Sequence, residues 1–394
     1  MDFVEFLNNT GIANFFNGNN WMNAIMCVIA LVFLFLALKF KFEPYLLIPI
    51  SVGMLLVNIY PAIYETVDSS GTVVATGLFG YLHKGVEYGI YPCLIFLGIG
   101  ATTDFGPLIA NKKTMLLGAA AQIGIFGAMM LALLFGFNLY EAGSIGIIGG
   151  ADGPTAILTS NTLLGRAVNA GVTTAENAKS LSAGIALAAY SYMALVPLIF
   201  PPIIRLLTTK KERSIKMEQL REVPKIEKVL FPIIVLVVVA LIVPDAAPLI
   251  GCLMLGNLIK ESGLVPNLVH TCANSLLYIC TILLGLSVGA TAIGTSFLQV
   301  KTLLIFALGI LAFILAAIFG LLGGKVMCLF TKGKVNPMIG IAGVSAVPMA
   351  ARVVQKEGQR EDPSNFLLMH AMGPNVAGVI GSAIAAGLLM AFIK

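Results

Sequence analysis

Residues Ile145 to Thr155 read Ile-Gly-Ile-Ile-Gly-Gly-Ala-Asp-Gly-Pro-Thr, which places one carboxylate, Asp152, in the middle of a long apolar chain. Glycine permits irregular turns, and proline removes a backbone donor and interrupts a helix. Within a membrane, irregular backbone is tolerated only where it is buried in protein or lines a cavity. An ionisable side chain at that depth indicates a functional site. The alternative, from this stretch alone, is a surface loop in which Asp152 is a solvated turn residue.

The composition predicts an all-α polytopic membrane protein. Of the 394 residues, 58% are hydrophobic and 11% are charged, whereas soluble domains carry about 25% charged residues. The excess of 24 Lys and Arg over 19 Asp and Glu therefore indicates where loops lie rather than that nucleic acid binds. The six cysteines form no Cys-x-x-Cys pair, and the three histidines are too scattered to indicate a metal site.

Charge placement orients the apolar spans, because loops rich in Lys and Arg stay in the cytoplasm. No basic residue precedes the first span, 22–38, but two lysines follow it, which places the N-terminus outside. Residues 205–228 carry eight basic and four acidic side chains and are expected in the cytoplasm. If residues 143–164 crossed the membrane, that segment would lie outside, so we expect a re-entrant hairpin with Asp152 near its tip. The expected full spans are 22–38, 44–64, 88–110, 114–136, 180–204, 229–244, 246–259, 275–297, 302–324 and 366–393.

The second half repeats this plan with the opposite orientation. An ungapped alignment of residues 145–156 with residues 339–350 gives six identities in twelve positions, including two aligned glycine–glycine pairs and one aligned proline. We therefore predict an inverted repeat in which each half has about five spanning helices and one re-entrant broken hairpin. The halves are 1–204 and 229–394, and 205–228 is a basic cytoplasmic linker. Two broken elements that face each other indicate a transport site near the membrane midplane and argue against the solvated loop.

The polar residues of the two hairpins suit a hard cation. The first hairpin offers Asp152 and Thr155, and the second, 336–354, offers Asn336, Ser345 and the cation Arg352. Oxygen ligands favour such a cation, and no cluster of Cys and His suggests a transition metal. A single carboxylate among neutral oxygens fits a monovalent ion, so sodium is the natural candidate. Proton exchange on Asp152 or on a tyrosine is the alternative.

Polar residues also interrupt the helix that follows each hairpin. Tyr190-Ser191-Tyr192 lies within span 180–204, and Asn375 lies within span 366–393. Each has a structural alternative: Tyr190 as a packing aromatic, and Asn375 as a kink residue bonded to a freed carbonyl. For Arg352 the structural alternative is that its side chain extends to the membrane surface and only determines the topology.

Three stretches together resemble a known family. They are Gly149–Thr155, Ala189–Met193 and the hairpin from Asn336 to Arg352, and they resemble the beta subunit of the biotin-dependent, sodium-pumping decarboxylases. That family includes the oxaloacetate, methylmalonyl-CoA, glutaconyl-CoA and malonate enzymes, and the resemblance covers nearly the whole chain. It implies an integral membrane subunit that decarboxylates carboxybiotin, consumes a proton and exports sodium.

The resemblance also implies roles for individual residues. The family's essential aspartate matches Asp152, and its tyrosine matches Tyr192. The catalytic residues that the resemblance implies are Asp152, Tyr192, Ser345 and Arg352. The carboxybiotin-binding residues that it implies are Arg352, Asn336 and Gly340. The sodium-binding residues that it implies are Asp152, Ser345, Asn336 and Asn375.

The implied partners are a carboxyltransferase alpha subunit, a separate biotin carrier protein and small membrane anchors of the gamma and delta type. A homo-oligomer, expected as a trimer, in the lipid bilayer of a prokaryotic plasma membrane is also implied. The chain has no Ala-Met-Lys-Met sequence, so biotin is not expected on it. Two other functions remain open: a secondary sodium–carboxylate symporter, in which Arg352 binds a substrate carboxylate, and a non-catalytic anchor. The sequence does not give the acid, because another subunit selects it.

Overall fold

The chain folds almost entirely into helices, as its composition predicts. The computed structural model describes residue 11 and residues 21–41, 43–67, 73–346 and 348–394. Five helices in these ranges are long and apolar enough to cross a membrane, or up to seven if each bent helix pair counts as one span. The strands described form one antiparallel pair, β1 (Glu65–Val67) and β2 (Val73–Thr76). The prediction of an all-α polytopic membrane protein is therefore confirmed.

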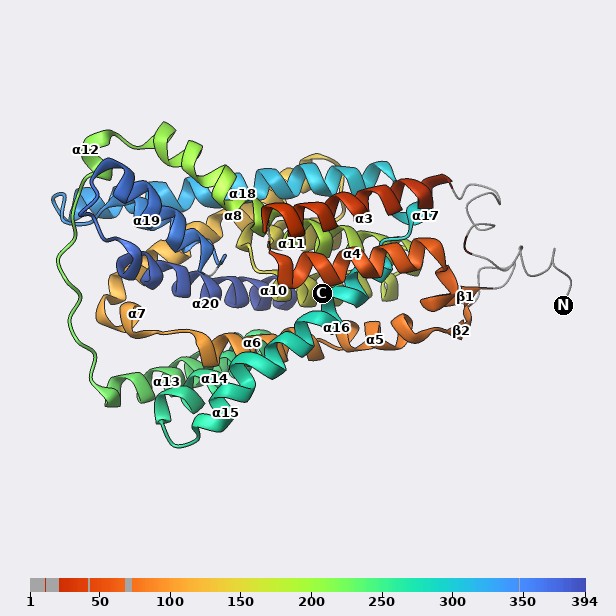
Figure 1. Cartoon of the computed structure of the whole chain (residues 1–394), viewed down its shortest axis with the longest axis horizontal. Helices are drawn as coiled ribbons and strands as arrows, with labels where there is room; N and C mark the ends of the chain where they lie inside the picture. The colour runs from red at the N-terminus through yellow and green to blue at the C-terminus, as the bar shows by residue number, and fades with distance from the viewer. Residues whose placement is uncertain (1–10, 12–20, 42, 68–72, 347) are drawn as a thin grey trace, which may run out of the picture.

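In the first half of the chain, the helical run is interrupted at Ala151 and Asp152, between η3 and α10. Figure 1 shows β1 and β2 at one end of the long axis and the basic linker with its short helix at the other. The helices of this half are α3 (Trp21–Phe40), α4 (Pro44–Ile59), η1 (Pro61–Ile63), α5 (Leu78–Glu87), α6 (Ile90–Thr102), α7 (Gly106–Ala110), η2 (Lys112–Thr114), α8 (Met115–Leu134), α9 (Leu139–Gly146), η3 (Ile147–Gly150), α10 (Gly153–Asn169) and α11 (Ala175–Leu207).

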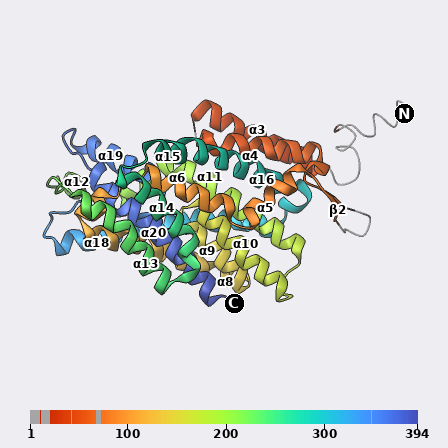
Figure 2. The same ribbon diagram turned by 90° about the horizontal axis from the view of Figure 1, so that it is seen from below.

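The second half of the chain is also mainly helical. Figure 2 shows α3 and α4 along one edge of the molecule and the C-terminus at the opposite edge. The helices of this half are α12 (Lys210–Arg213), α13 (Lys225–Ile242), η4 (Pro244–Ala246), α14 (Ala247–Ser262), α15 (Pro266–His270), the π-helix η5 (Thr271–Leu276), α16 (Leu277–Thr291), α17 (Gly294–Phe297), α18 (Val300–Phe330), η6 (Pro337–Gly343), α19 (Met349–Glu361) and α20 (Leu368–Phe392).

Several expected spans differ from the helices in the structure. The span expected at 44–64 ends at Ile59, where a 3₁₀ turn leads into β1. The span expected at 88–110 is interrupted after Thr102, where α6 ends, and α7 begins only at Gly106. At the start of this span the axis bends by 63° between α5 and α6, where Gly89 adopts a φ of 71° that glycine permits. Near Met193, α11 also bends by 63°, because Pro197 cannot donate to the carbonyl one turn earlier.

One helix from each half crosses a helix from the other half through glycines. On α6, a Cβ at Gly100 would lie 2.0 Å from the carbonyl oxygen of Leu253 on α14. A Cβ at Gly256 would lie equally close to the carbonyl oxygen of Leu97. Only glycine permits so close a backbone approach, which is the usual way in which membrane helices associate.

A second crossing, of α4 with α16, repeats this arrangement. A Cβ at Gly289 would lie 2.1 Å from the carbonyl oxygen of Ile50, and one at Gly53 would lie 2.4 Å from that of Leu286. The residues of the two crossings correspond at fixed offsets, 189 positions from α6 to α16 and 203 positions from α4 to α14. The two crossings are therefore built from equivalent residues.

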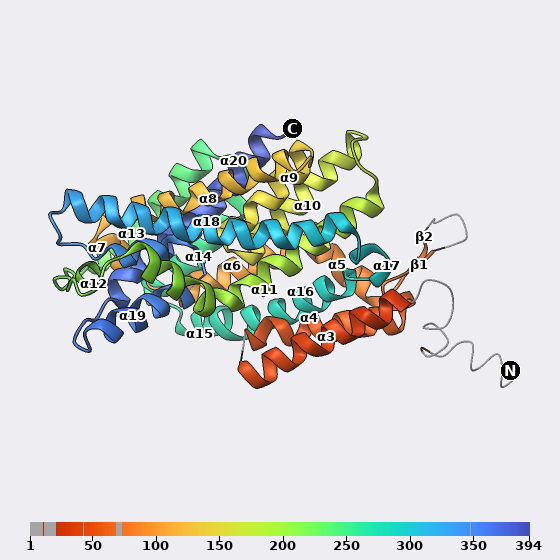
Figure 3. The ribbon, with the colours of Figure 1, turned by 90° about the horizontal axis from the view of Figure 1, so that it is seen from above.

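The remaining long helices surround the two hairpins. Figure 3 shows α18 along the length of the molecule beside α8, and these two helices pack closely. Between them and α11 lies the largest cluster of buried apolar side chains. It includes Ile145 and Ile148 from the first hairpin and Ile339 and Ile341 from the second. Both hairpins are therefore held in the core of the protein.

Candidate functional site

The first hairpin is shaped by local sequence signals. At its start, the side chain of Asn138 accepts a hydrogen bond from the backbone amide of Glu141 at 2.9 Å. The side chain of Glu141 in turn accepts one from the backbone amide of Asn138 at 3.2 Å, and the two bonds form a capping box for α9. The chain then turns at Ala151, whose φ of 55° is left-handed, and α10 begins directly after Asp152. Pro154 is suited to this first helical turn because its missing N–H needs no partner there.

The break in each hairpin meets the break in the other. The backbone amide of Ser345 donates a hydrogen bond to the carbonyl oxygen of Gly150 at 3.3 Å. Asp152 and Ser345 thus approach the same place from opposite halves of the chain. Tyr190 on α11 packs directly against this point, since a Cβ at Gly153 would lie 2.1 Å from its ring.

The carboxylate of Asp152 is buried and has no cationic partner in the part of the chain that the structure describes. Only 7% of the residue is exposed. Its Oδ2 accepts hydrogen bonds from the hydroxyl of Thr155 and, at 3.2 Å, from that of Ser382 on α20. The positive end of the α10 dipole adds a favourable field. Hydroxyls and a helix dipole do not neutralise a buried charge, so the site favours a bound cation or a proton.

Asp152 opens into a cavity of about 280 Å³. The hydroxyl of Ser345 also faces this space and has no hydrogen-bond partner among the described residues. The opposite wall comes from the start of α4 and from α6 and α16. Its polar lining residues are Glu43, Tyr45, Thr102, Thr103, Tyr278 and Thr281.

Both predicted asparagines bind backbone carbonyls and lie outside the cavity lining. Asn375 donates to the carbonyl oxygens of Ala342 and Val344, both at 2.9 Å, and its own side-chain oxygen accepts no hydrogen bond from the described residues. Asn336 donates to the carbonyl oxygens of Arg213 and Ile215 at 3.0 and 2.9 Å. These contacts fix the second hairpin to α20 and to the linker.

Gly340 also has a packing role. A Cβ there would lie 2.1 Å from the carbonyl oxygen of Gly320, so glycine lets the second hairpin touch α18. Arg352 lies in the first turns of α19 with an exposed side chain and makes no ion pair with the described residues.

The two tyrosines of α11 have different environments. The hydroxyl of Tyr192 donates to the carbonyl oxygen of Phe306 at 2.6 Å, and its ring packs edge-on against Phe306 and Phe313. Tyr190 lines the Asp152 cavity, and its buried hydroxyl has no hydrogen-bond partner in the part of the chain that the structure describes. Sequence reasoning left Tyr190 open between a site residue and a packing aromatic, and it did not find Ser382. A serine among the small residues of α20 carries no signal of its own.

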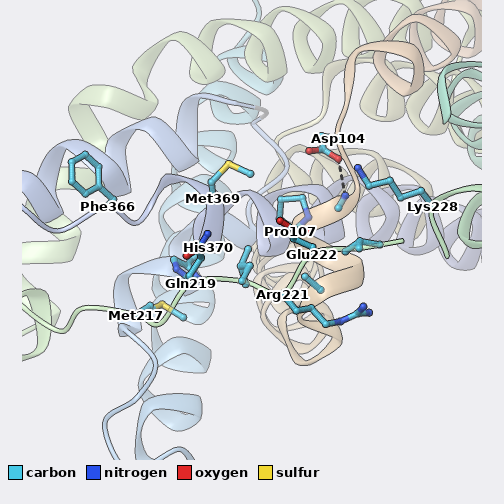
Figure 4. A pocket seen from close by; sticks show the side chains of 14 residues that line it. Asp104, Pro107, Met217, Gln219, Arg221, Glu222, Lys228, Phe366, Met369 and His370 are labelled. Atoms are coloured by element: carbon cyan, nitrogen blue, oxygen red, sulfur yellow. Dashed lines mark hydrogen bonds between the residues drawn. The ribbon is translucent and has the colours of Figure 1, made fainter. Parts of the chain in front are cut away.

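A larger cavity, of about 780 Å³, lies beside the linker and shares no lining residue with the Asp152 cavity. Figure 4 shows Met217, Gln219 and Glu222 of the linker near Pro107, Met369 and His370. Asp104 accepts a hydrogen bond there from the amide of Gly106 at 2.8 Å. None of the predicted site residues lines this cavity.

Comparison with known proteins identifies the family. Residues 22–393 match the model of the Na⁺-transporting oxaloacetate decarboxylase beta subunit. The chain belongs to this family. It is 52% identical over 404 residues to the methylmalonyl-CoA decarboxylase subunit beta of Propionigenium modestum, covering 98% of both chains. It is 51% identical over 373 residues to the glutaconyl-CoA decarboxylase subunit beta of Acidaminococcus fermentans, covering 95% of this chain and 94% of the relative. It is 46% identical over 424 residues to the oxaloacetate decarboxylase beta chain 2 of Salmonella typhi, covering 94% and 95%.

Membership confirms the resemblance found in the sequence. The protein is a multi-pass membrane subunit of a prokaryotic sodium-transporting decarboxylase. As a beta subunit it forms part of a complex with other subunits.

Proposed function

We propose that this beta subunit decarboxylates carboxybiotin, delivered on a separate carrier protein, and couples the reaction to sodium export. One observation carries the proposal: Asp152 is buried at the point where the two hairpins meet, faces a cavity, and has no cationic partner among the described residues. A buried carboxylate of this kind is stable only with a bound cation or a proton. Exchange between the two is the step that links ion movement to chemistry.

Sodium is proposed to bind the carboxylate of Asp152 and the free hydroxyl of Ser345. The hydroxyl oxygens of Thr155 and Ser382 keep lone pairs for the ion, and oxygen ligands suit a hard cation. A cation bound at a carboxylate competes with a proton there. Sodium entry therefore expels a proton from Asp152.

The expelled proton is proposed to complete the decarboxylation. When the bond between nitrogen and the carboxylate carbon of carboxybiotin breaks, carbon dioxide leaves and the nitrogen must gain one proton. A tyrosine hydroxyl is the proposed carrier of that proton. The resemblance implies Tyr192, and the position of Tyr190 in the cavity lining makes it a second candidate.

Arg352 is proposed to orient the carboxylate of carboxybiotin with its planar donor fork. Its exposed side chain, free of ion pairs within the described ranges, supports that role. For Asn336, Gly340 and Asn375 we propose an indirect role in ion and carboxybiotin binding. Their contacts hold the second hairpin, and the hairpin positions Ser345 and Arg352.

We further propose that the chain is an inverted repeat of residues 1–204 and 229–394, joined by the cytoplasmic linker 205–228. The equivalent glycine crossings of α6 with α14 and of α4 with α16 support it. The proposed partners are a carboxyltransferase alpha subunit, a biotin carrier protein, small anchors of the gamma and delta type, and further copies of this chain as a trimer.

Reconstitution of the purified complex in proteoliposomes tests the function. Added carboxybiotin carrier should drive sodium movement without a pre-formed gradient, and Asp152→Asn should abolish both turnover and sodium movement while the complex still assembles. A symporter would instead respond to a gradient and a dissolved carboxylate. If Asp152→Asn kept both full decarboxylation and full sodium movement, the result would favour a non-catalytic anchor.

A further inference from the structure

Two further cavities lie between α10 and α11, beyond the Asp152 cavity. The outer cavity has a volume of about 340 Å³ and reaches Asn169 and Ala175, at the two sides of the loop that joins these helices. The middle cavity, of about 10 Å³, shares His83, Lys179 and Ser182 with the outer one. By the proposed topology, the outer cavity lies toward the outside of the cell.

The lining residues of α10 place the three cavities in a row. Gly153 and Pro154 line the Asp152 cavity, Ile157 lines the middle cavity, and Asn161 lines the outer cavity. Successive positions in this series are three or four residues apart, so they lie on one face of the helix. This face therefore leads from Asp152 to the outer cavity.

Two other helices line the cavities in the same order. On α11, Tyr190 lines the Asp152 cavity, Ala186 lines the middle cavity, and Ser182 lines both the middle and the outer cavity. On α16, Thr281 lines the Asp152 cavity and Val288 lines the middle cavity. The row thus follows from the lining residues of three separate helices.

The middle cavity is the narrow point of the row. Its volume is about the space that one water molecule requires. Ile157, Ala186 and Val288 line it and are only 1%, 3% and 2% exposed. They belong to one cluster of buried apolar side chains. Because an apolar constriction excludes water and with it an ion, the row is closed to sodium in this structure.

The outer cavity is polar where the middle cavity is apolar. The hydroxyl of Ser182 and the carboxylate of Glu87 line it, and Glu87 has no lysine or arginine partner among the described residues. Lys179 also lines it, but the carboxylate of Glu65 pairs with that ammonium at 3.0 Å. His83 is 8% exposed, and its Nδ1 has no hydrogen-bond partner within the described ranges, which indicates that water enters this cavity. The outer cavity is therefore suited to a hydrated cation.

We propose that this row of cavities is the route by which sodium leaves Asp152 for the outside, and that Ile157, Ala186 and Val288 form its gate. This inference rests on the proposed function, because it takes Asp152 as the sodium site. Since α10 begins directly after Asp152 and carries Ile157, a movement of α10 away from α16 opens the gate and turns the site toward the outer cavity.

The first test measures passive sodium leak from proteoliposomes that contain the intact complex, without carboxybiotin. Ile157→Ala removes apolar bulk from the gate, so the leak should rise about tenfold over wild type. Ile185→Ala is the matched control, because Ile185 is equally buried in another cluster and lines none of the three cavities. Equal leaks in the two variants would overturn the gate.

The second test fills the gate instead of opening it. Ala186→Leu should lower sodium movement driven by the carboxybiotin carrier about tenfold or more, while equilibrium binding of radioactive sodium to the purified complex stays as in wild type. Ala188→Leu adds the same bulk to the same helix at a buried position that lines none of the three cavities. Equal sodium movement in the two variants would overturn the route.

The third test measures access from outside in a variant that lacks the six native cysteines. Ser182→Cys should react with a small impermeant thiol reagent added to intact cells. Ala186→Cys, one turn deeper, should react only when Ile157→Ala is also present. Failure of Ser182→Cys to react would overturn the route, and reaction of Ala186→Cys alone would overturn the gate.

The route and the proposed function fail separately. A wild-type complex that decarboxylates carboxybiotin without moving sodium would refute the proposed function. Normal wild-type pumping, with equal behaviour of Ile157→Ala and Ile185→Ala and of Ala186→Leu and Ala188→Leu, would refute only the route.

Discussion

The amide of Ser345 donates a hydrogen bond to the carbonyl oxygen of Gly150, 195 positions earlier in the chain. This bond joins the backbone breaks of two hairpins at the edge of the Asp152 cavity. Irregular backbone inside an apolar protein must satisfy its polar groups internally, so each break provides a hydrogen-bond partner for the other. Movement of one hairpin relative to the other must break this bond and change the surroundings of Asp152.

Ser382 is predicted to tune the sodium affinity of the site. Its hydroxyl donates to Asp152 at 3.2 Å, so Ser382→Ala removes one hydrogen bond from the carboxylate and one oxygen from the site. At about 1 kcal/mol for such a contact, the sodium concentration for half-maximal decarboxylation should rise about fivefold. Ser287→Ala is the control, because that buried hydroxyl bonds only to the carbonyl oxygen of Leu283 on its own helix. An equal sodium requirement in both variants would show that Ser382 has no role at the site.

Phenylalanine substitutions distinguish the two tyrosines of α11. Tyr190→Phe removes a hydroxyl that lines the cavity and has no hydrogen-bond partner within the described ranges, so it should lower the maximal rate at saturating sodium and leave stability almost unchanged. Tyr192→Phe removes a hydrogen bond to Phe306 and should lower thermal stability, by about 1 kcal/mol. Turnover at saturating sodium and thermal unfolding measure the two effects. A large loss of rate in Tyr192→Phe alone would assign the proton route to Tyr192.

The glycine crossings predict where an added methyl group is not tolerated. In Gly289→Ala the new Cβ would lie 2.1 Å from the carbonyl oxygen of Ile50, so α4 and α16 must separate. Overpacking of this kind typically costs about 1–3 kcal/mol, which thermal unfolding in detergent can detect. At Gly165 on α10 nothing lies within 4 Å, so Gly165→Ala should be neutral or slightly stabilising. Equal melting temperatures for the two variants would contradict the close crossing.

The ion pair between α11 and α19 predicts a pH-dependent stability. Arg205 donates two hydrogen bonds to Glu357, at 2.6 and 2.8 Å, and these hold the pKa of Glu357 below its ordinary value of 4.5. A lowered folded-state pKa contributes stability above the unfolded value and loses it as the pH falls through the folded value. Arg205→Gln should thus unfold more readily than wild type at about pH 7, and the difference should shrink below about pH 4. Lys211→Gln, an exposed control, should show no such change.

The sequence predicted the parts of the site that local composition marks. Asp152 is recognisable because a carboxylate among glycines and a proline is unusual in an apolar chain, and the repeated motif identified the second hairpin. In the structure Ser345 lines the same cavity as Asp152, although no local sequence signal indicates that the two residues lie together. The contact of Ser382 with Asp152 depends on a helix that approaches from far along the chain, so no short motif reveals it.

Asn336 illustrates how sequence reading can miss a long-range contact. Beside a proline in a glycine-rich hairpin, it is a reasonable cation ligand. In the structure its amide binds Arg213 and Ile215, more than a hundred positions earlier. The ends of several predicted spans differ from the ends of the helices for a similar reason. Hydropathy does not detect a break such as the one after Thr102, where Asn257 and Lys260 of α14 bind the freed carbonyl oxygen of Thr103.

Labelling of single cysteines tests the proposed topology, which underlies the direction of sodium export. The basic linker must be cytoplasmic by the positive-inside rule, and the loop between α10 and α11 must then lie outside. Figure 3 shows that loop toward the end of the molecule opposite α12. In a variant that lacks the six native cysteines, Val172→Cys should react with an impermeant thiol reagent added to intact cells, because Val172 is 50% exposed. Glu218→Cys, also exposed, should react only after the membrane is opened. Labelling of Glu218→Cys from outside, with Val172→Cys protected, would reverse the orientation and place Arg352 on the side from which a cytoplasmic carrier cannot reach it.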